Sequence, residues 1–245
     1  MCKTCGCAAV AGSTPSNVRS PGPIVEVVQD LLEANDRLAA HNRAHFDSHG
    51  VLAINLMSSP GSGKTALLEA TIVALRDRYR MAVIEGDLET ENDAARIRAH
   101  GVPAIQITTG TACHLDARLV HQALHDLPLA GLDLLFIENV GNLVCPASFD
   151  LGQHLNVTLL SVTEGDDKPA KYPVIFRASD LVVLSKADLL GVVDDFDPDR
   201  AGRALDSLGW RTPDIASWLD WLQGKLAWRR FAATAPPANV SSMGM

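Results

Sequence analysis

The sequence predicts an α/β fold in which a mostly parallel sheet is flanked by helices, behind a Cys-rich N-terminal tail. Short apolar runs of strand length recur along the chain and alternate with segments of helical spacing. The stretch from Leu52 to Leu68 passes from such a run through a small-residue turn into a helix. Polar residues follow the ends of several runs, which is where ligands bind on a parallel sheet. We therefore expect a single doubly wound domain with its binding site at the carboxyl ends of the strands.

Length and charge limit the classes of function. At 245 residues the chain holds one α/β domain plus extensions, and its formal charge of −8 argues against binding to nucleic acid or an anionic membrane. No apolar run reaches the roughly 18 residues of a membrane span and no signal peptide precedes the first helix, so we expect a cytoplasmic protein without membrane insertion. Five cysteines in that compartment favour metal-binding thiolates over disulfides.

The N-terminal residues MCKTCGC contain three closely spaced cysteines, Cys2, Cys5 and Cys7. Three such thiolates can wrap one soft or borderline metal ion, and Gly6 lets the backbone fold tightly between them. The alternative is an oxidisable terminus without a metal. Because the next residues are small, polar and Pro-rich, we assign residues 1–23 to a metal-binding tail and flexible linker, and residues 24–245 to a helix followed by the nucleotide domain.

A helix is predicted from Ile24 to about His49. Three histidines at its end, His41, His45 and His49, fall four apart and can share one face. One interpretation is a set of metal ligands, but we favour a solvated basic end that stabilises the helix C-terminus. The apolar face of the helix is expected to consist of Ile24, Val27, Val28, Leu31, Leu32 and Leu38.

The turn SSPGSGKT, residues 58–65, follows the first apolar strand and opens a helix, which is the context that a phosphate-binding P-loop requires. Backbone N–H groups of the turn can curl around an anion, and the helix N-terminus adds partial positive charge. Lys64 can reach the β- and γ-phosphates, and the Thr65 hydroxyl can ligate Mg²⁺. Ser58 stands where the strict pattern has glycine, and the alternative is a chance turn before a helix. The predicted nucleotide contacts are Pro60, Gly61, Ser62, Gly63, Lys64, Thr65 and Ala66.

A second strand, within MAVIEGDLET, ends in the sequence EGD, of which Asp87 is the last residue. A carboxylate at the tip of the strand beside a P-loop can hold Mg²⁺ through water, and we assign that role to Asp87. The alternative is a helix N-cap, since the sequence END at residues 91–93 begins the next helical segment.

A fully apolar strand from Leu132 to Ile137 leads into Glu138, Gly141 and Cys145. Glu138 can help to position water or Mg²⁺. The Gly141 N–H can contact a γ-phosphate, so that the loop would change shape when this phosphate leaves. A metal ligand at Cys145 would then connect hydrolysis with metal release.

Cys145 as an ordinary buried cysteine is the alternative. It is less favoured because another predicted strand, Ala104 to Ile107, leads into Cys113 and His114 at the start of a helix, and this loop can meet Cys145. Thiolate and imidazole groups together suit a soft or borderline metal ion.

After an apolar strand at Asn156–Val162 and a short helix, the run LVVLS ends a strand in the sequence SKAD, residues 185–188. Asp188 can accept from guanine N1–H and its 2-amino group, a donor pair that adenine lacks, and the Lys186 stem can cover the ring. This pattern predicts GTP as the nucleotide. The remaining residues, 191–245, are expected to form a Pro/Asp-rich link and a Trp-rich helix around Trp218 whose role is packing.

Together these motifs resemble one known family. The chain is similar over nearly its whole length to the HypB family, the nickel-incorporation GTPases of [NiFe]-hydrogenase maturation. The resemblance implies a SIMIBI-class G domain that forms a homodimer around bound nucleotide and delivers Ni²⁺ to the [NiFe]-hydrogenase large-subunit precursor. The segments that carry it are MCKTCGC, HNRAHF, SSPGSGKT, EGDLETENDAARI, TGTACHLDA, FIENVGNLVCPASFDLG, SVTEGDDKPAKYP and SKADLL.

The same resemblance implies metal sites and partners. The partner would be the hydrogenase maturation zinc protein usually paired with this GTPase, and sometimes a nickel-storage chaperone. We identify no arginine finger or catalytic glutamine in the sequence, so unaided GTP hydrolysis should be slow. The implied sites are a tight nickel site of Cys2, Cys5 and Cys7, and a dimer-interface site for nickel or zinc of Cys113, His114 and Cys145.

Two departures from the family pattern concern the base pocket. Ser185 stands where the family has an asparagine that ties the base-reading loop to the P-loop and touches the purine. We therefore expect weaker nucleotide binding, with specificity kept by Asp188. The family also carries a further strand and a Ser-Ala-x-Thr-Gly-x-Gly segment before its terminal helix, whereas here DSLGWRTPDIASWLDWL runs almost directly into that helix.

Three other functions are compatible with parts of the sequence. A nickel or zinc carrier with impaired nucleotide binding is suggested by the rebuilt C-terminal segment. A urease-type nickel GTPase shares the P-loop and guanine motifs, but the N-terminal cysteines and ENVGNLVC argue against it. A small-molecule P-loop kinase should have an Arg-rich lid, which we do not identify in the sequence.

Overall fold

The computed structural model describes residues 23–88, 91–206 and 215–234. The tail cysteines Cys2, Cys5 and Cys7 lie outside these ranges, so the predicted tail site stays a prediction. Among the described residues, no helix combines the length and the apolar character that a membrane span needs.

The centre of the molecule is a sheet of six strands, all paired in parallel, in the order β3-β2-β4-β1-β5-β6. β1 lies between β4 and β5, so the turn that follows it leaves the sheet near the middle of its carboxyl edge. The predicted parallel sheet is confirmed, although β4 begins two residues later than expected and includes Glu138. The strands are β1 (Leu52–Met57), β2 (Met81–Asp87), β3 (Ala104–Thr108), β4 (Leu134–Glu138), β5 (Leu155–Ser161) and β6 (Leu181–Ser185).

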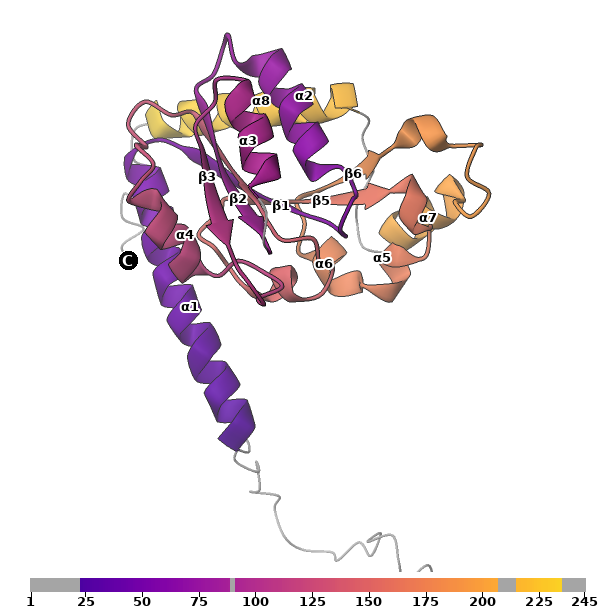
Figure 1. Cartoon of the computed structure of the whole chain (residues 1–245), viewed down its shortest axis with the longest axis horizontal. Coiled ribbons are helices and arrows are strands. Elements are labelled where there is room, and N and C mark those ends of the chain that lie inside the picture. The colour runs from indigo at the N-terminus through magenta and orange to yellow at the C-terminus, as the bar shows by residue number, and fades with distance from the viewer. Residues whose placement is uncertain (1–22, 89–90, 207–214, 235–245) are drawn as a thin grey trace, which may run out of the picture.

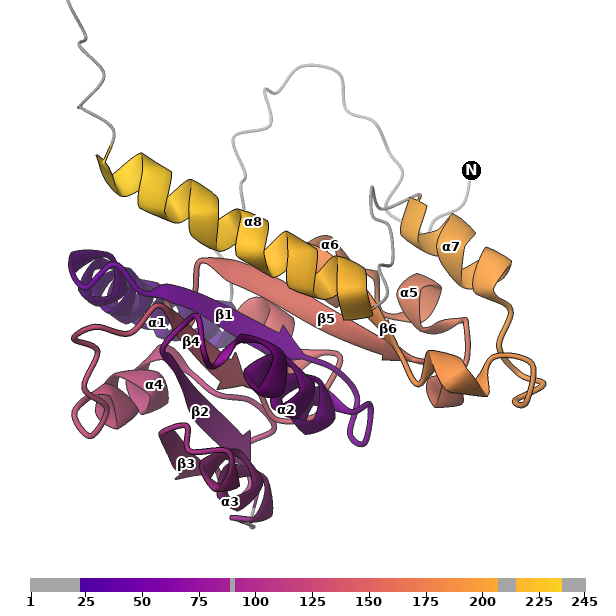
Figure 2. The ribbon, with the colours of Figure 1, turned by 90° about the horizontal axis from the view of Figure 1, so that it is seen from above.

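Helices cover both faces of the sheet, which explains why its central strands are apolar on both sides. α2, α3 and α8 pack on one face, α1 and α4 on the other (Figures 1 and 2). Side chains alternate between the two layers, so that Ile54 of β1 packs under α2 and Ala53 packs in the layer with α1. The helices are α1 (Pro23–Ser48), α2 (Lys64–Leu75), α3 (Asn92–Ala99), α4 (Ala117–Leu124), α5 (Lys168–Lys171), α6 (Pro173–Arg177), α7 (Pro198–Asp206) and α8 (Ile215–Thr234).

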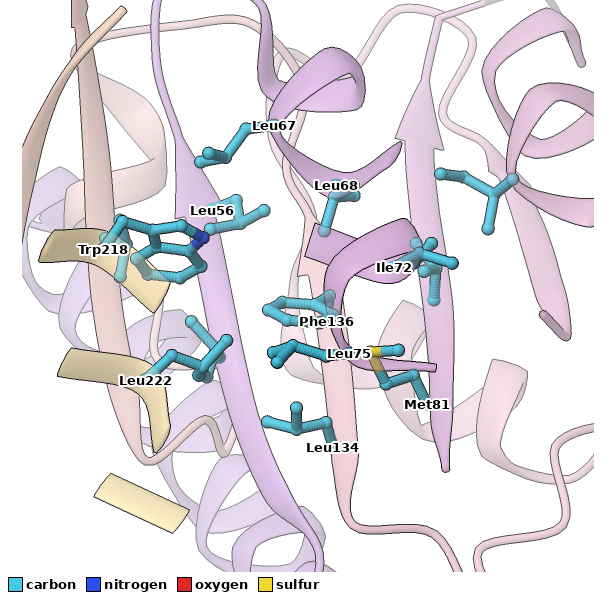
Figure 3. Packing of buried hydrophobic residues seen from close by; sticks show 14 of the residues in the cluster. Leu56, Leu67, Leu68, Ile72, Leu75, Met81, Leu134, Phe136, Trp218 and Leu222 are labelled. Atoms are coloured by element: carbon cyan, nitrogen blue, oxygen red, sulfur yellow. The ribbon is translucent and has the colours of Figure 1, made fainter. Parts of the chain in front are cut away.

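The C-terminal helix α8 is a structural element of the core. Trp218 is fully buried among residues of α2 and the sheet (Figure 3). Its indole Nε1 donates to Thr71 Oγ1 of α2 at 2.9 Å, so its one polar atom is satisfied. The interpretation of this Trp-rich helix as a packing element agrees with the structure.

Two sequence expectations about helices were wrong. The apolar face proposed for α1 is wrong at Leu31, which is 63% exposed; Leu32 and Leu38 are half-buried, and the buried residues are Ala39, Asn42 and Phe46. The reason is that the N-terminal half of α1 extends beyond the sheet (Figure 1). The segment expected as a Pro/Asp-rich link contains α7, which has Pro198 at its first position.

We predict that Trp218→Ala lowers the free energy of unfolding by about 3–5 kcal/mol, because it leaves a large cavity under α8. Urea-induced unfolding followed by far-UV circular dichroism measures this loss. Trp228 on the same helix is 68% exposed and provides the matched control, since its replacement by alanine should cost about 0.5 kcal/mol or less. Equal losses in the two variants would contradict the assignment of α8 to the core.

Candidate functional site

The P-loop geometry depends on two glycines. Gly61 and Gly63 have φ angles of +72° and +92°, a region that residues with a Cβ rarely adopt. Gly63 immediately precedes Lys64, the first residue of α2, so the turn passes directly into the helix N-terminus as predicted. Backbone N–H groups at such a terminus suit a phosphate group.

Ser58 occupies the position at which the strict P-loop pattern has glycine, and its side chain is accommodated by hydrogen bonds within the turn. Its side chain is buried, donates to the carbonyl oxygen of Ser59 at 2.7 Å, and accepts from Lys64 Nζ at 3.1 Å. The hydroxyl therefore holds the P-loop lysine across the turn. An acidic residue that the sequence analysis missed, Glu164, also binds the turn, accepting from the hydroxyls of Ser59 and Ser62.

A cluster of carboxyl groups lies beside the P-loop. Glu138 Oε1 accepts from Thr65 Oγ1 at 3.0 Å and lies 4.0 Å from Lys64 Nζ. Glu85 and Asp93 each have an oxygen that lies within 4.8 Å of a Glu138 oxygen. The sequence analysis did not identify Glu85 or Asp93 as site residues. For Glu85, the pairing of β2 with β4 places it directly opposite Glu138.

Asp87, which we had proposed as the Mg²⁺ ligand, is not a member of this cluster. Its Oδ1 accepts from the backbone N–H of Leu88 at 2.7 Å at the end of β2. Its role therefore stays a prediction.

The carboxyl groups of Glu85 and Glu138 are both buried and lie next to one another. Burial, and then the charge of Glu138, raises the pKa of Glu85, while burial raises the pKa of Glu138 against the opposing effect of Lys64. One oxygen of each carboxyl group, Oε2, is buried and has no hydrogen-bond partner among the described residues. Uncommitted carboxylate oxygens beside a threonine hydroxyl are the ligands that Mg²⁺ prefers. The residues present therefore fit this cation.

The segment predicted to bind the base, residues 185–188, lies at the end of β6 beside the P-loop and the start of α2. Lys186 and Asp188 line a cavity of about 440 Å³ together with the start of α2, including Gly63 and Ala66. Ser185 Oγ donates to the carbonyl oxygen of Ser62 at 2.7 Å. Serine at this position therefore keeps a tie to the P-loop, because its hydroxyl reaches the turn directly, and the weaker nucleotide binding expected from the sequence stays a prediction.

A second cluster contains sulfur and nitrogen ligands. Cys113, His114 and Cys145 each offer one ligand atom, and these atoms all lie within 4.8 Å of one another. The two Sγ atoms are 3.1 Å apart, and Cys113 Sγ is 3.7 Å from His114 Nδ1. The structure thus brings together residues that are 32 positions apart in sequence. Cys113 and His114 lie in the loop before α4 rather than in the helix, because Asp116 is its N-cap.

Asparagine side chains hold both loops of this cluster. Asn139 Oδ1 accepts from the N–H of Leu115 at 3.1 Å, directly after the Cys113–His114 pair. Asn142 Oδ1 accepts from the N–H of Cys145 at 3.3 Å. The His114 ring stacks on Phe149 with centroids 4.0 Å apart, and burial lowers its pKa, which keeps a nitrogen lone pair available.

The loop that carries Cys145 also contacts the P-loop. A Cβ atom on Gly141 would lie 2.7 Å from the Cα of Pro60, so only glycine fits this approach without a shift. The segment from Glu138 to Cys145 is therefore in contact with the phosphate-binding turn at one end and with the sulfur cluster at the other.

The P-loop, the carboxyl cluster and the cavity at the strand ends define a P-loop nucleotide-binding protein. The family model described as the CobW/HypB/UreG nucleotide-binding domain matches residues 52–203. The chain belongs to the HypB family.

Three comparisons show the extent of this similarity. Hydrogenase maturation factor HypB of Escherichia coli strain K12 is 56% identical over 213 residues, which cover 82% of this chain and 72% of that protein. A crystal structure of HypB from Helicobacter pylori in complex with nickel has a TM-score of 0.75 at 40% identity and covers 80% of this chain and 96% of that one. Against the HypB of Rhizobium leguminosarum, 59% identical over 171 residues, the match covers 70% of this chain but only 57% of the relative's length.

We predict that Glu85→Gln stabilises the protein increasingly as the pH rises. Because the pKa of Glu85 is raised in the folded state, the folded chain keeps a proton that the unfolded chain releases above about pH 4.3, so wild-type stability falls with rising pH in this range. Glutamine has no proton to release. Each kcal/mol gained should raise the Tm by about 2–4 °C in a chain of this size. Thermal unfolding between pH 5 and pH 8 measures the trend.

The control is Glu33→Gln, which replaces a side chain that is 70% exposed on α1 and should leave the pH dependence of the Tm unchanged. A constant difference between Glu85→Gln and wild type at every pH would argue against a protonated Glu85.

Proposed function

We propose that this chain is a GTP-hydrolysing metallochaperone that binds nickel and delivers it to the [NiFe]-hydrogenase large subunit during maturation. One observation carries the proposal: the segment from Glu138 to Cys145 contacts the P-loop through Gly141 and the sulfur cluster through Cys145. A change at a phosphate bound near Gly141 could therefore reach Cys145, which lies four positions further along the same loop.

In this proposal, different residues bind the phosphates and the base of the nucleotide, and all of them lie in the described part of the chain. Lys64 and the N–H groups from Gly61 to Thr65 would hold the phosphates, and Gly141 would contact the γ-phosphate. In the cavity beside α2, Asp188 would accept from the guanine edge. The tie between Ser185 and the Ser62 carbonyl supports a working base loop over the alternative of a carrier with impaired nucleotide binding.

Mg²⁺ would be held by Thr65 and the carboxyl cluster, with Asp87 as a further ligand through water. When bound, it would neutralise charge on the phosphates. Thr65 and Glu138 already contact one another, so the residues are pre-organised for a cation. Glu138 would lose its raised pKa near such a charge and would act as a carboxylate that orients water.

The transported metal ion would bind at the sulfur cluster. Thiolate and imidazole ligands suit Ni²⁺ and Zn²⁺, and the nickel-bound H. pylori relative supports nickel. Three ligands from one chain leave the coordination incomplete, which supports a homodimer that shares the ion at its interface. Delivery would then involve the hydrogenase maturation zinc protein as partner. The tail cysteines Cys2, Cys5 and Cys7 would supply a separate nickel site.

Calorimetric titration of the full chain with GTP, ATP and Ni²⁺ tests this function. We expect micromolar GTP binding that Asp188→Ala abolishes, no comparable ATP binding, and Ni²⁺ binding that falls by about half an equivalent per chain, the share of one ion between two chains, when Cys113 and Cys145 are replaced by alanine. The triple variant Cys2→Ala/Cys5→Ala/Cys7→Ala should lose the separate nickel ion of the tail and keep the shared one. Nickel binding without nucleotide binding would overturn the GTPase and favour the carrier.

We predict that Ser185→Ala weakens GTP binding about 2- to 10-fold, because it removes a hydrogen bond worth about 0.5–1.5 kcal/mol between the base loop and the P-loop. Ser48→Ala is a matched control, since it removes an exposed hydroxyl that bonds only within its own helix end. Competition titration against a fluorescent GTP analogue measures both. Unchanged affinity in Ser185→Ala would show that the tie to Ser62 does not support the base.

A further inference from the structure

Five of the eight histidines of the chain gather where α1 packs against α4. His41, His45 and His49 follow one another at intervals of one helical turn on α1, and His121 and His125 do so at the end of α4. None of these side chains is buried, and none belongs to the P-loop or to the group of Cys113, His114 and Cys145, although α4 begins three residues after His114. The function proposed above uses none of these five histidines.

The spacing of the rings fits shared coordination. The ring centroids are 5.2 Å apart for His41 and His121 and 5.1 Å apart for His121 and His125. Two imidazoles that bind one ion at about 2.0–2.1 Å with a tetrahedral angle have ring centres about 5 Å apart. The His45–His49 pair, at 4.8 Å, has the same spacing.

Hydrogen bonds set the tautomer of two of the rings. Asn42 donates its amide to the carbonyls of Ala117 and Leu151, so its Oδ1 is an acceptor, and His121 Nδ1 must donate to it at 3.0 Å. His49 Nδ1 likewise lies 3.0 Å from the carbonyl oxygen of His45. In both rings Nε2 is left with its lone pair free to bind an ion. Metal-binding histidines are typically oriented by this kind of outer hydrogen bond.

The surroundings of His45 and His121 lower the pKa of both side chains, which favours the neutral form that binds metals. Burial lowers the pKa of His45, and the neighbouring His49, His41, His121 and His125 lower it further in that order. Burial and then His41 and His125 lower the pKa of His121. A lowered pKa at His45 and His121 disfavours the positive charge that a basic helix end requires, which is the interpretation favoured from the sequence.

We propose that His41 and His45 of α1 and His121 and His125 of α4 form a second binding site for a divalent transition-metal ion, distinct from the sulfur cluster. In the structure no three of their nitrogen atoms lie within 4.8 Å of one another, so binding requires rotation of the exposed rings about χ1 and χ2. Pure imidazole ligation suits Zn²⁺, Ni²⁺ and Cu²⁺. An ion held by both helices would join the α1 segment to the nucleotide domain.

The test uses the full chain with all five cysteines replaced by alanine, so that the sulfur sites cannot contribute. Equilibrium dialysis against Zn²⁺ or Ni²⁺ alone should then show one bound equivalent. The double variant His41→Gln/His125→Gln in this background should weaken binding about tenfold or more, and His100→Gln, outside the cluster, should leave it unchanged. Both replaced side chains are exposed, so the variant should keep its fold.

A second measurement does not depend on replacing cysteines. In the wild-type chain, long-range ¹H–¹⁵N correlation spectra of the histidine rings should show Zn²⁺-induced shifts at the Nε2 atoms of His121 and His41. The proposal is overturned by a cysteine-free chain that binds no equivalent, or by binding that survives unchanged in His41→Gln/His125→Gln. Failure of GTP binding would not affect either result, so this site and the proposed function are tested separately.

Discussion

The arrangement of the whole site depends on the parallel pairing of β1 with β4. This register sets Leu56 opposite Glu138, so the end of β4 lies directly beside the start of the P-loop. Lys64 and Thr65 follow the P-loop turn in the chain, and both are then close enough to contact the Glu138 carboxyl group. On its other edge β4 pairs with β2, and this register places Glu85 directly opposite Glu138. The β1–β4 and β4–β2 registers thus bring together side chains from the ends of β2 and β4 and from the turn that follows β1.

Burying carboxyl groups together has an energetic cost that the surroundings offset only in part. Lys64 lies nearby, but its Nζ is 4.0 Å from Glu138 Oε1 and also donates a hydrogen bond to Ser58 Oγ. The remaining imbalance is relieved by protonation, since a neutral glutamic acid costs less to bury than a second carboxylate. Natural proteins retain such unfavourable groups where they bind something, because a cation converts the repulsion into attraction.

Much of the fold and site follows from local sequence signals, and the parts that do not are nonlocal. The strands, the P-loop turn and the grouping of Cys113, His114 and Cys145 were predictable because each has a short pattern at a strand end. Glu85 and Glu164 were missed because their partners come from register and from a distant loop. Leu31 was misassigned because helical periodicity identifies an apolar face but cannot tell where the sheet beneath it ends. In α7, proline and aspartate suggested a link, although both favour a helix start.

The hydrogen bond between Trp218 and Thr71 has a mechanical consequence. It joins α8 to α2, the helix that begins with the P-loop lysine, through a fully buried indole ring. The two helices also share one buried apolar cluster, whose dense packing resists displacement of either helix. The loop from Asn139 to Phe149 includes only one short 3-10 turn, at Cys145–Ser148, and no strand pairing. We therefore expect any movement at the strand ends to fall on the loop that carries Cys145 rather than on the packed side of the P-loop formed by α2 and α8.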